Sequence, residues 1–326
     1  MIDEYGREID YIRISVTDRC NLRCVYCMPE EGVPSISHDE ILRFDEITRI
    51  CRVLAGKGFK KVKLTGGEPL VRKGILSLIK EIKAIDGIEN VTVTTNGVLL
   101  EEMYGALADA GVDAVTVSLD TLDPEMYRRL TRRGELETVL RGLTLAMREN
   151  RIPLKINCVS VYGVREQELL KVAALARDNA VHVRFIEMMP IGMGREFTFV
   201  GEEEIRRMLE EAFGPAKTYG GVLGNGPARY WEFEGFKGKI GFISAVSHKF
   251  CSSCNRIRLT SDGFLKTCLQ FDEGADLRRI LREGGSDEAL AAAIDEAVGR
   301  KPLGHNFGEK NTFSGRENRG MSQIGG

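Results

Sequence analysis

The chain has 326 residues, 43% of them hydrophobic and 29% charged, and a formal net charge of -2. This length suits one large domain plus a smaller one, and the near-neutral charge excludes a protein that is basic throughout and binds nucleic acid. No apolar stretch is long enough to span a bilayer and the N-terminus is charged, so we expect a cytoplasmic protein with no membrane or nucleic-acid partner. The eight cysteines should then stay reduced, and clustered cysteines indicate metal sites.

Strand-like and helical segments alternate through roughly the first 190 residues. The expected strands are 11–16, 62–65, 91–94, 114–119, 154–159 and 181–186. The expected helices are 44–55, 74–85, 101–110, 135–149 and 166–179. This alternation predicts an α/β fold, an incomplete (β/α)6 barrel of the TIM type, because six units are fewer than the eight of a complete barrel. An antiparallel sheet with one solvated face is the alternative, and the helical connections fit it less well.

The expected strands place apolar residues on one face and polar residues on the other. If the apolar faces pack on the helices, the polar faces line the lumen. Thr94 of the third strand then faces the lumen. Four strands contribute a lumen cation: Arg13, Lys63, Lys155 and Arg184. Buried, unpaired cations are too costly to serve as packing. The pattern therefore predicts an anionic ligand that accepts hydrogen bonds.

The alternation weakens after Pro190, and residues 191–194 are expected to form a linker. A helix at 202–212 follows, then β-like segments at 230–233 and 239–244 and helices at 276–282 and 287–298. We therefore divide the chain into a partial barrel, residues 1–195, and a C-terminal α+β domain, residues 196–326. The polar, glycine-rich tail 301–326 lacks periodicity and is expected to be mobile by default.

Three cysteines, Cys20, Cys24 and Cys27, follow the first strand in a C-x3-C-x2-C spacing. Thiolates so spaced suit either zinc or an iron–sulfur cluster. A structural zinc would need a fourth ligand, for which His38 is the local candidate. A [4Fe-4S] cluster on three thiolates would leave one iron open to a substrate. Because the loop lies at the C-terminal end of a strand, where barrel active sites lie, we favour a catalytic site.

The cysteine spacing, with Tyr26 before the last cysteine, resembles the signature of radical S-adenosylmethionine enzymes. The segment Thr65-Gly66-Gly67-Glu68-Pro69 after the second strand resembles the GGE motif of that family. The resemblance implies that the open iron binds the methionine moiety of S-adenosylmethionine and that reduction releases a 5′-deoxyadenosyl radical. It also implies four contacts to this cofactor: Tyr26, Gly67, Ser118 and Met189.

A second set of cysteines, Cys251, Cys254 and Cys268, lies in the C-terminal region. A redox CxxC motif is disfavoured by the third cysteine. A second three-cysteine iron–sulfur cluster is our prediction for the set. A structural zinc with His248 as its fourth ligand is the alternative.

The segments 13–29, 184–189 and 251–268 and the terminal Gly325-Gly326 closely resemble the GTP 3′,8-cyclase family of molybdenum cofactor biosynthesis. The resemblance implies two [4Fe-4S] clusters and conversion of GTP to (8S)-3′,8-cyclo-7,8-dihydroguanosine 5′-triphosphate. In that reaction the radical removes the ribose 3′ hydrogen, the carbon radical attacks C8 of guanine, and the second cluster anchors the base. The GTP-binding positions implied are Arg13, Lys63, Thr94, Lys155, Arg256, Ile257 and Arg258. Lys63 replaces what is often an arginine in the family.

The resemblance also implies partners: an electron donor such as flavodoxin or ferredoxin, and a downstream cyclic pyranopterin synthase. It places the glycine tail in the active site, and a homodimer is left open. Two other functions are weighed. A peptide-modifying maturase would commonly carry more C-terminal cysteines, and a zinc or electron-transfer protein would leave the GGE motif unexplained. Outside the motifs, we expect Cys51 and Cys158 in the core and interpret His182 and His305 as structural.

Overall fold

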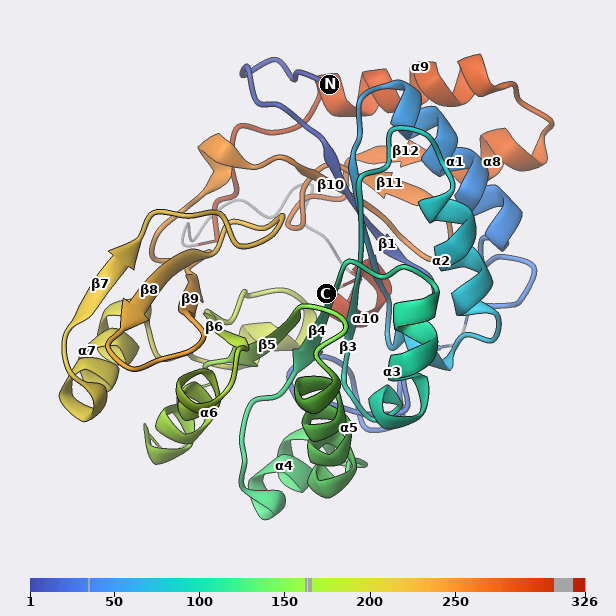
Figure 1. The fold of residues 1–326 in the computed structure, drawn as a ribbon. Helices are drawn as coiled ribbons and strands as arrows, with labels where there is room; N and C mark the ends of the chain where they lie inside the picture. The colour runs from blue at the N-terminus through green and yellow to red at the C-terminus, as the bar shows by residue number, and fades with distance from the viewer. Residues whose placement is uncertain (35, 162, 164–165, 308–318, 326) are drawn as a thin grey trace.

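The computed structural model describes residues 1–34, 36–161, 163, 166–307 and 319–325. Its centre is a mixed sheet of twelve strands among these residues, in the order β12-β11-β10-β1-β2-β3-β4-β5-β6-β9-β8-β7 (Figure 1). The first six strands run parallel to their neighbours in sequence order. They are β1 (Tyr11–Ser15), β2 (Lys61–Thr65), β3 (Asn90–Thr95), β4 (Ala114–Ser118), β5 (Leu154–Val159) and β6 (His182–Ile186). The parallel arrangement confirms the predicted crossovers and excludes the antiparallel alternative.

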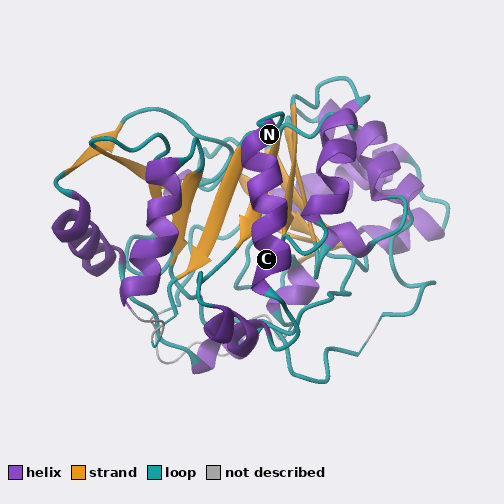
Figure 2. Ribbon diagram, turned by 60° about the horizontal axis from the view of Figure 1, so that its bottom comes forward, coloured by secondary structure: helices purple, strands orange, loops and turns teal. Residues whose placement is uncertain are grey.

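Helices connect the parallel strands and lie on the outer side of the sheet (Figures 1 and 2). They are α1 (Phe44–Gly56), α2 (Ile75–Lys83), α3 (Leu100–Asp109), α4 (Pro124–Thr131), α5 (Leu136–Glu149) and α6 (Glu166–Asp178). The five expected helices are confirmed with ends displaced by a few residues. The short α4 was not expected.

The two faces of the parallel strands differ as their sequence pattern predicts. In β1 and β2, Ile12, Ile14, Val62 and Leu64 are fully buried in the hydrophobic core against the helices. The polar residues between them face the other side of the sheet, since neighbours on a strand alternate. Cys51 and Cys158 are also fully buried in this core, which confirms their predicted structural role.

The C-terminal region adds strands to both edges of the parallel sheet. After α7 (Glu202–Phe213), the hairpin strands β7 (Ala216–Tyr219), β8 (Arg229–Phe233) and β9 (Ile240–Ile243) extend the β6 edge, where β9 is parallel to β6. The chain then returns to β1. There the added elements are β10 (Arg256–Leu259), β11 (Phe264–Lys266), β12 (Gly274–Asp276), α8 (Leu277–Arg282), α9 (Asp287–Gly299) and α10 (Met321–Ile324). One sheet therefore runs through both predicted domains, and their boundary at residue 195 stays a prediction.

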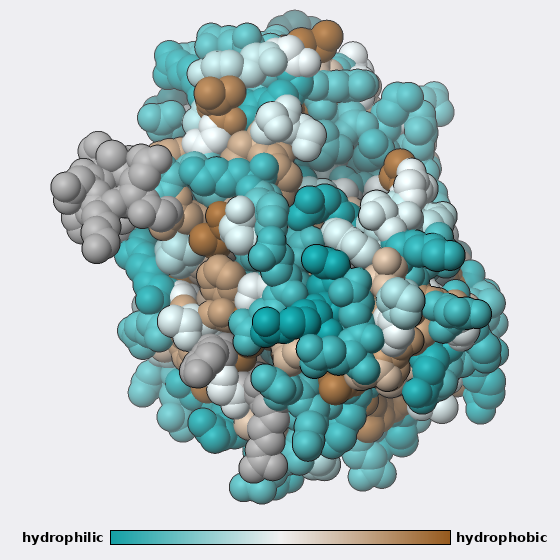
Figure 3. All heavy atoms as spheres, turned by 90° about the vertical axis from the view of Figure 1, so that its left-hand side faces the viewer, coloured by the Kyte–Doolittle hydropathy of each residue, from teal (hydrophilic) through white to brown (hydrophobic). Residues whose placement is uncertain are grey.

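Two further expectations concern the linker at residues 191–194 and membrane-spanning segments. Residues 191–194 are no extended linker: they enter the short 3-10 turn Gly192–Glu196, with Ile191 and Gly194 buried. No helix within the described ranges has the length and apolar character needed to cross a membrane. The face in Figure 3 is largely hydrophilic, with apolar residues scattered over it.

Candidate functional site

A cavity of about 600 Å³ lies on the polar face of the sheet. Residues from all six parallel strands line it, together with both cysteine loops and the C-terminal tail. Nearly every residue predicted for the site borders this one space: Arg13, Cys20, Cys24, Tyr26, Cys27, Lys63, Gly67, Thr94, Ser118, Lys155, Met189, Cys251, Cys254, Arg256, Arg258 and Cys268. Segments far apart in the sequence therefore meet here.

Ile257 is the exception. Its side chain is fully buried in the hydrophobic core and does not border the cavity. The reason is the alternation of β10, which turns Arg256 and Arg258 toward the cavity and the residue between them away from it. The side chain of Ile257 therefore does not face the cavity, and the predicted contact of this residue with the substrate stays a prediction.

The first cysteine loop is held against the turn that follows β2. The Gly67 backbone N–H donates to the Thr17 carbonyl at 2.7 Å, and the Glu68 N–H donates to the Arg19 carbonyl at 2.8 Å. A Cβ on Gly67 would lie 2.4 Å from the Arg19 oxygen, and one on Gly66 would lie 2.5 Å from the Thr17 oxygen. Only glycines let the two loops approach this closely, so the GGE segment fixes the cysteine loop in place.

The three thiols of this loop influence one another. Burial raises the pKa of the Cys24 thiol well above its usual value, and the neighbouring Cys27 and Cys20 thiols raise it further. Burial, followed by Cys20, raises the pKa of Cys27 to about 12. Three partly buried thiols that oppose each other's ionisation fit a positively charged centre, which favours all three thiolates together. The donor set therefore suits an iron–sulfur cluster.

Two buried carboxylates border the first cysteine set. The Tyr26 hydroxyl donates to Asp120 Oδ2 at 2.6 Å, and burial raises the pKa of Asp120 to about 6. Glu68 accepts hydrogen bonds from the Thr95 hydroxyl at 2.8 Å and the Asn96 backbone N–H at 2.6 Å, and burial raises its pKa to about 7. Asp120 and Asn96 were not among the residues predicted from the sequence. The signal that could have identified them is their position at strand ends, since Asn96 directly follows β3 and Asp120 lies two residues after β4.

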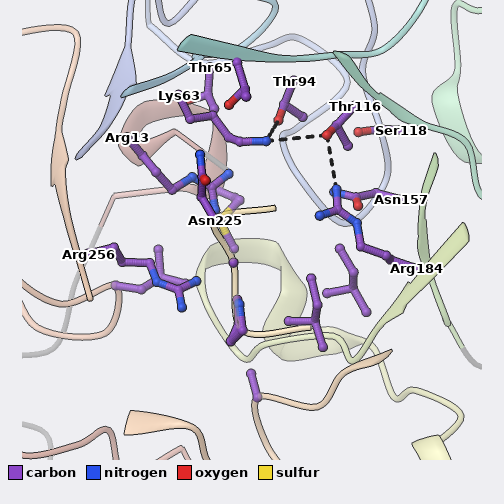
Figure 4. A pocket seen from close by; sticks show the side chains of 18 of the residues that line it. Arg13, Lys63, Thr65, Thr94, Thr116, Ser118, Asn157, Arg184, Asn225 and Arg256 are labelled. Carbon is purple, nitrogen blue, oxygen red and sulfur yellow. Dashed lines mark hydrogen bonds between the residues drawn. The ribbon is translucent and has the colours of Figure 1, made fainter. Parts of the chain in front are cut away.

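Two of the lumen cations, Lys63 and Arg184, are connected across the sheet through Thr116 (Figure 4). Lys63 Nζ donates to the hydroxyls of Thr94 at 3.3 Å and Thr116 at 3.4 Å, and Arg184 Nη2 donates to the same Thr116 hydroxyl at 3.1 Å. Burial lowers the pKa of Lys63 well below its usual value, and Arg184 and then Arg13 lower it further. These charges repel one another, so the cavity suits an anion, and the anionic ligand itself stays a prediction.

Arg13 lies between the lumen cations and the strand β10, which follows Cys251 and Cys254. The register places it beside Lys63 of β2 on one side and beside Arg258 of β10 on the other. Burial lowers the pKa of Arg258 well below its usual value, and the neighbouring Arg13 and Arg256 add to this. The cations of β1, β2 and β10 therefore converge on one part of the cavity.

The second cysteine set brackets β10. Cys251 lies in the 3-10 turn Cys251–Ser253, and Cys268 follows β11. Burial raises the pKa of Cys251, and the thiols of Cys268 and Cys254 raise it further. Although burial opposes it, Arg256 and Lys301 lower the pKa of Cys254. Three neighbouring cysteines beside cations again fit an iron–sulfur cluster.

The two histidines considered as zinc ligands lie away from the cysteines. His38 and His248 are both exposed, and neither borders the cavity. His248 Nδ1 lies 2.9 Å from the Ser247 hydroxyl and near Glu202. Neither histidine is therefore placed to complete a zinc site with the cysteines.

The C-terminal tail reaches the cavity. The Gly325 carbonyl accepts a hydrogen bond from Arg258 Nη1 at 2.7 Å, and a Cβ on Gly325 would lie 2.6 Å from the Thr65 hydroxyl. The expectation of a mobile tail was therefore wrong for Gly325. Residues 308–318 and Gly326 lie outside the described residues.

Two histidines interpreted as structural also border the cavity. His182 Nδ1 accepts the backbone N–H of Lys239 at 3.1 Å, and burial lowers its pKa to about 4. The His305 ring stacks on Phe307 with 4.3 Å between ring centroids. Both rings therefore have protein contacts that fix them, although they lie at the cavity wall.

Comparisons with known proteins agree with this arrangement. Residues 14–176 match the Radical SAM superfamily, and residues 181–307 match the family described as Molybdenum Cofactor Synthesis C. A GTP 3′,8-cyclase of Heliobacterium modesticaldum is 45% identical over 330 residues, and one of Moorella thermoacetica is 44% identical over 328 residues. Each alignment covers 100% of both chains.

Solved structures extend the comparison to the fold. The chain resembles SuiB of Streptococcus suis bound to the precursor peptide SuiA, with a TM-score of 0.62 and 17% identity, over 91% of this chain and 66% of that one. At this identity the likeness concerns the fold alone. Together with the full-length relatives, it shows that the chain has the radical SAM α/β fold and belongs to the GTP 3′,8-cyclase family.

Proposed function

We propose that the chain converts GTP to (8S)-3′,8-cyclo-7,8-dihydroguanosine 5′-triphosphate, the first step of molybdenum cofactor biosynthesis, by radical S-adenosylmethionine chemistry. The observation that carries the proposal is that one cavity brings together two cysteine sets and the cations of five strands. Full-length relatives with that printed activity support it. The proposal includes the finer architecture, an incomplete (β/α)6 barrel with a C-terminal region that holds a second cluster.

The first part of the site would bind the cofactors. Cys20, Cys24 and Cys27 would hold one [4Fe-4S] cluster, which when bound supplies the electron that cleaves S-adenosylmethionine to a 5′-deoxyadenosyl radical. Four residues would contact S-adenosylmethionine: Tyr26, Gly67, Ser118 and Met189. Asp120 would orient Tyr26 through the hydrogen bond to its hydroxyl. Burial of this region in the cavity would keep water away from the radical.

The second part would bind the substrate. Cys251, Cys254 and Cys268 would hold the second [4Fe-4S] cluster, whose open iron anchors the guanine. The triphosphate and ribose would be bound by Arg13, Lys63, Thr94, Lys155, Arg256 and Arg258. Several converging cations are what a triphosphate needs, because each supplies a charge-assisted hydrogen bond. Arg184 joins them, since it shares Thr116 with Lys63.

Partners and location belong to the same proposal. The radical reaction needs a one-electron donor, which we take to be flavodoxin or ferredoxin. The cyclised nucleotide would pass to a cyclic pyranopterin synthase. A cytosolic location, a homodimer and the domain boundary at residue 195 remain predictions from the sequence.

The decisive experiment is an anaerobic assay of the iron-reconstituted protein with S-adenosylmethionine, dithionite and GTP. We expect GTP-dependent formation of 5′-deoxyadenosine together with a cyclised nucleotide. Cleavage of S-adenosylmethionine that is indifferent to GTP would favour a peptide-modifying enzyme. Failure to form any iron–sulfur cluster would exclude both enzymatic functions.

Arg256→Ala tests the substrate site within this assay. We expect GTP turnover to fall about 100-fold or more because a charge-assisted phosphate contact is lost, with the iron content unchanged. The matched control is Arg300→Ala, which removes an exposed arginine paired with Glu296 on α9 and should leave turnover intact. Equal turnover of Arg256→Ala and the control would contradict the role of Arg256.

A further inference from the structure

Asn96 lines the same cavity as Cys20, and its side chain contacts the first cysteine loop. Asn96 follows β3 directly. Its Nδ2 donates to Asn21 Oδ1 at 2.7 Å and to Cys20 Sγ at 3.7 Å. The backbone N–H of Leu22 donates to the same sulfur at 3.4 Å. Cys20 thus receives one N–H from its own loop and one from a separate strand end.

The orientation of this amide is fixed by contacts outside the cysteine loop. Asn96 Oδ1 accepts the backbone N–H of Val98 at 3.0 Å, so the NH2 group must point the opposite way, toward Cys20. The backbone N–H of Asn96 donates to Glu68 Oε2 at 2.6 Å. Glu68 is itself held by Thr95 and Leu70. The donor is therefore positioned before any cluster binds.

A donor to the Cys20 sulfur acts on its charge. The N–H groups of Leu22 and Asn96 both donate to the Cys20 sulfur and so stabilise negative charge on it. An iron–sulfur cluster gains one negative charge on reduction, and hydrogen bonds to its sulfurs are among the factors that set its potential. An N–H donor favours the more negative, reduced state.

We propose that Asn96 is a positioning residue that raises the reduction potential of the first cluster through its N–H···S contact with Cys20. In this step one electron passes from the external one-electron donor to the cluster, and no bond of the protein forms or breaks. The inference rests on the proposed function only in requiring a cluster on Cys20, Cys24 and Cys27. It does not depend on the identity of the substrate.

The test is a redox titration of the reconstituted holoenzyme followed by EPR. The signal of the first cluster is identified by its change on addition of S-adenosylmethionine. Asn96→Leu keeps the shape but removes the donor. It should lower the equilibrium constant for reduction of the first cluster about tenfold, which is about 59 mV for one electron. The second cluster, read in the same sample, should keep its potential.

Two further variants make the result decisive. Asn96→Asp keeps the acceptor for Val98 but replaces the donor with an oxygen, and it should lower the potential of the first cluster at least as much. If Asn96→Leu fails to retain the cluster, the Asp variant decides the question. Asn179→Leu is the matched control, because Asn179 lies at the end of α6 and bonds only locally to the Leu175 carbonyl.

The outcomes separate the two proposals. Wild-type potentials in both Asn96 variants would overturn the inference, and so would equal displacement of both clusters, which would indicate a general loss of structure. A wild-type protein that assembles no [4Fe-4S] cluster on Cys20, Cys24 and Cys27 would contradict the proposed function instead.

Discussion

At the scale of single residues, the charges in the cavity are held away from their ordinary ionisation. Burial, followed by the charge of Arg184, lowers the pKa of Lys155 to about 8. Lys63 is affected in the same direction by burial and by Arg184. Without a neighbouring anion these lysines lose protons at a lower pH than exposed lysines do. An anion that enters the cavity reverses the effect, because it favours the charged ammonium.

This reversal predicts that GTP binding takes up protons. At pH 8.5 the terminal phosphate is already ionised, so lysines that regain their charge are the source of the uptake. Lys155→Arg should take up about half a proton less, since a guanidinium stays charged at this pH. Isothermal titration calorimetry in two buffers of different ionisation enthalpy measures the uptake. The exposed Lys217→Arg on β7 is the control, and equal uptake by wild type and Lys155→Arg would rule out the lysine as the source.

At the scale of elements, the turn after β2 and the cysteine loop after β1 depend on each other. Gly67→Ala would place a methyl group against the Arg19 carbonyl, whose backbone leads into Cys20. We expect it to reduce the free energy of unfolding by about 1–3 kcal/mol and to lower the iron content of the first site. Urea unfolding and iron analysis measure the two effects.

The control for this change is Gly56→Ala. Gly56 ends α1 and has open space where the methyl group would lie, so alanine there should be neutral or slightly stabilising. If Gly67→Ala matched this control in both measurements, the close approach of the two loops would contribute neither to the free energy of unfolding nor to iron binding.

The elements that could be predicted are those whose own residues specify them. Strands β1 to β6 alternate strictly and are separated by long amphipathic helices, so local pattern was enough. Strand β10 has only four residues, Arg256–Leu259, and lies between cysteines. Its stability comes from pairing with β1, which no local pattern records. Helix α4 was missed because its eight residues, Pro124–Thr131, carry little apolar surface.

The site divides in the same way. The cysteine sets and the cations were predicted because spacing and strand alternation are written in the sequence. Asn96 and Asp120 contact residues of the first cysteine loop, which are far from them in the sequence, and such contacts form only in the folded protein. Ile257 was predicted together with its neighbours Arg256 and Arg258, but its side chain turns to the opposite face of the sheet, and its contact with the substrate stays a prediction.

At the scale of the whole molecule, a buried ion pair at the N-terminus holds the second cysteine region. Arg7 Nε lies 2.6 Å from Asp3 Oδ2, and both side chains are almost fully buried. The remaining guanidinium nitrogens donate to four carbonyls, those of Cys251, Lys301, Pro302 and Leu303. Arg7, near the start of the chain, thus contacts both the second cysteine set and the first residues of the C-terminal tail.

Arg7→Met should therefore act at a distance. It leaves the Asp3 carboxylate buried without its partner, and we expect a loss of about 3–5 kcal/mol in the free energy of unfolding. The iron content of the second site should fall as well. Urea unfolding and metal analysis provide the readouts. The double variant Asp3→Asn with Arg7→Met should recover part of the stability, because no unpaired charge remains.

An exposed arginine gives the comparison. Arg141 pairs with Glu101 at the surface, and Arg141→Met should change stability little. Similar losses for Arg7→Met and Arg141→Met would show that the buried pair has no special role in holding the second cysteine region.

The sheet order has a consequence for how the chain is made. β1 is paired on one edge with β2, which follows early, and on the other with β10, whose residues lie 245 positions further along. On the ribosome, that second edge stays bare while most of the chain is synthesised, and bare strand edges recruit other chains. During this long interval the unpaired edge of β1 can aggregate, and chaperone binding to the nascent chain should matter most. The edge of β1 is covered only when β10, which is synthesised late, pairs with it.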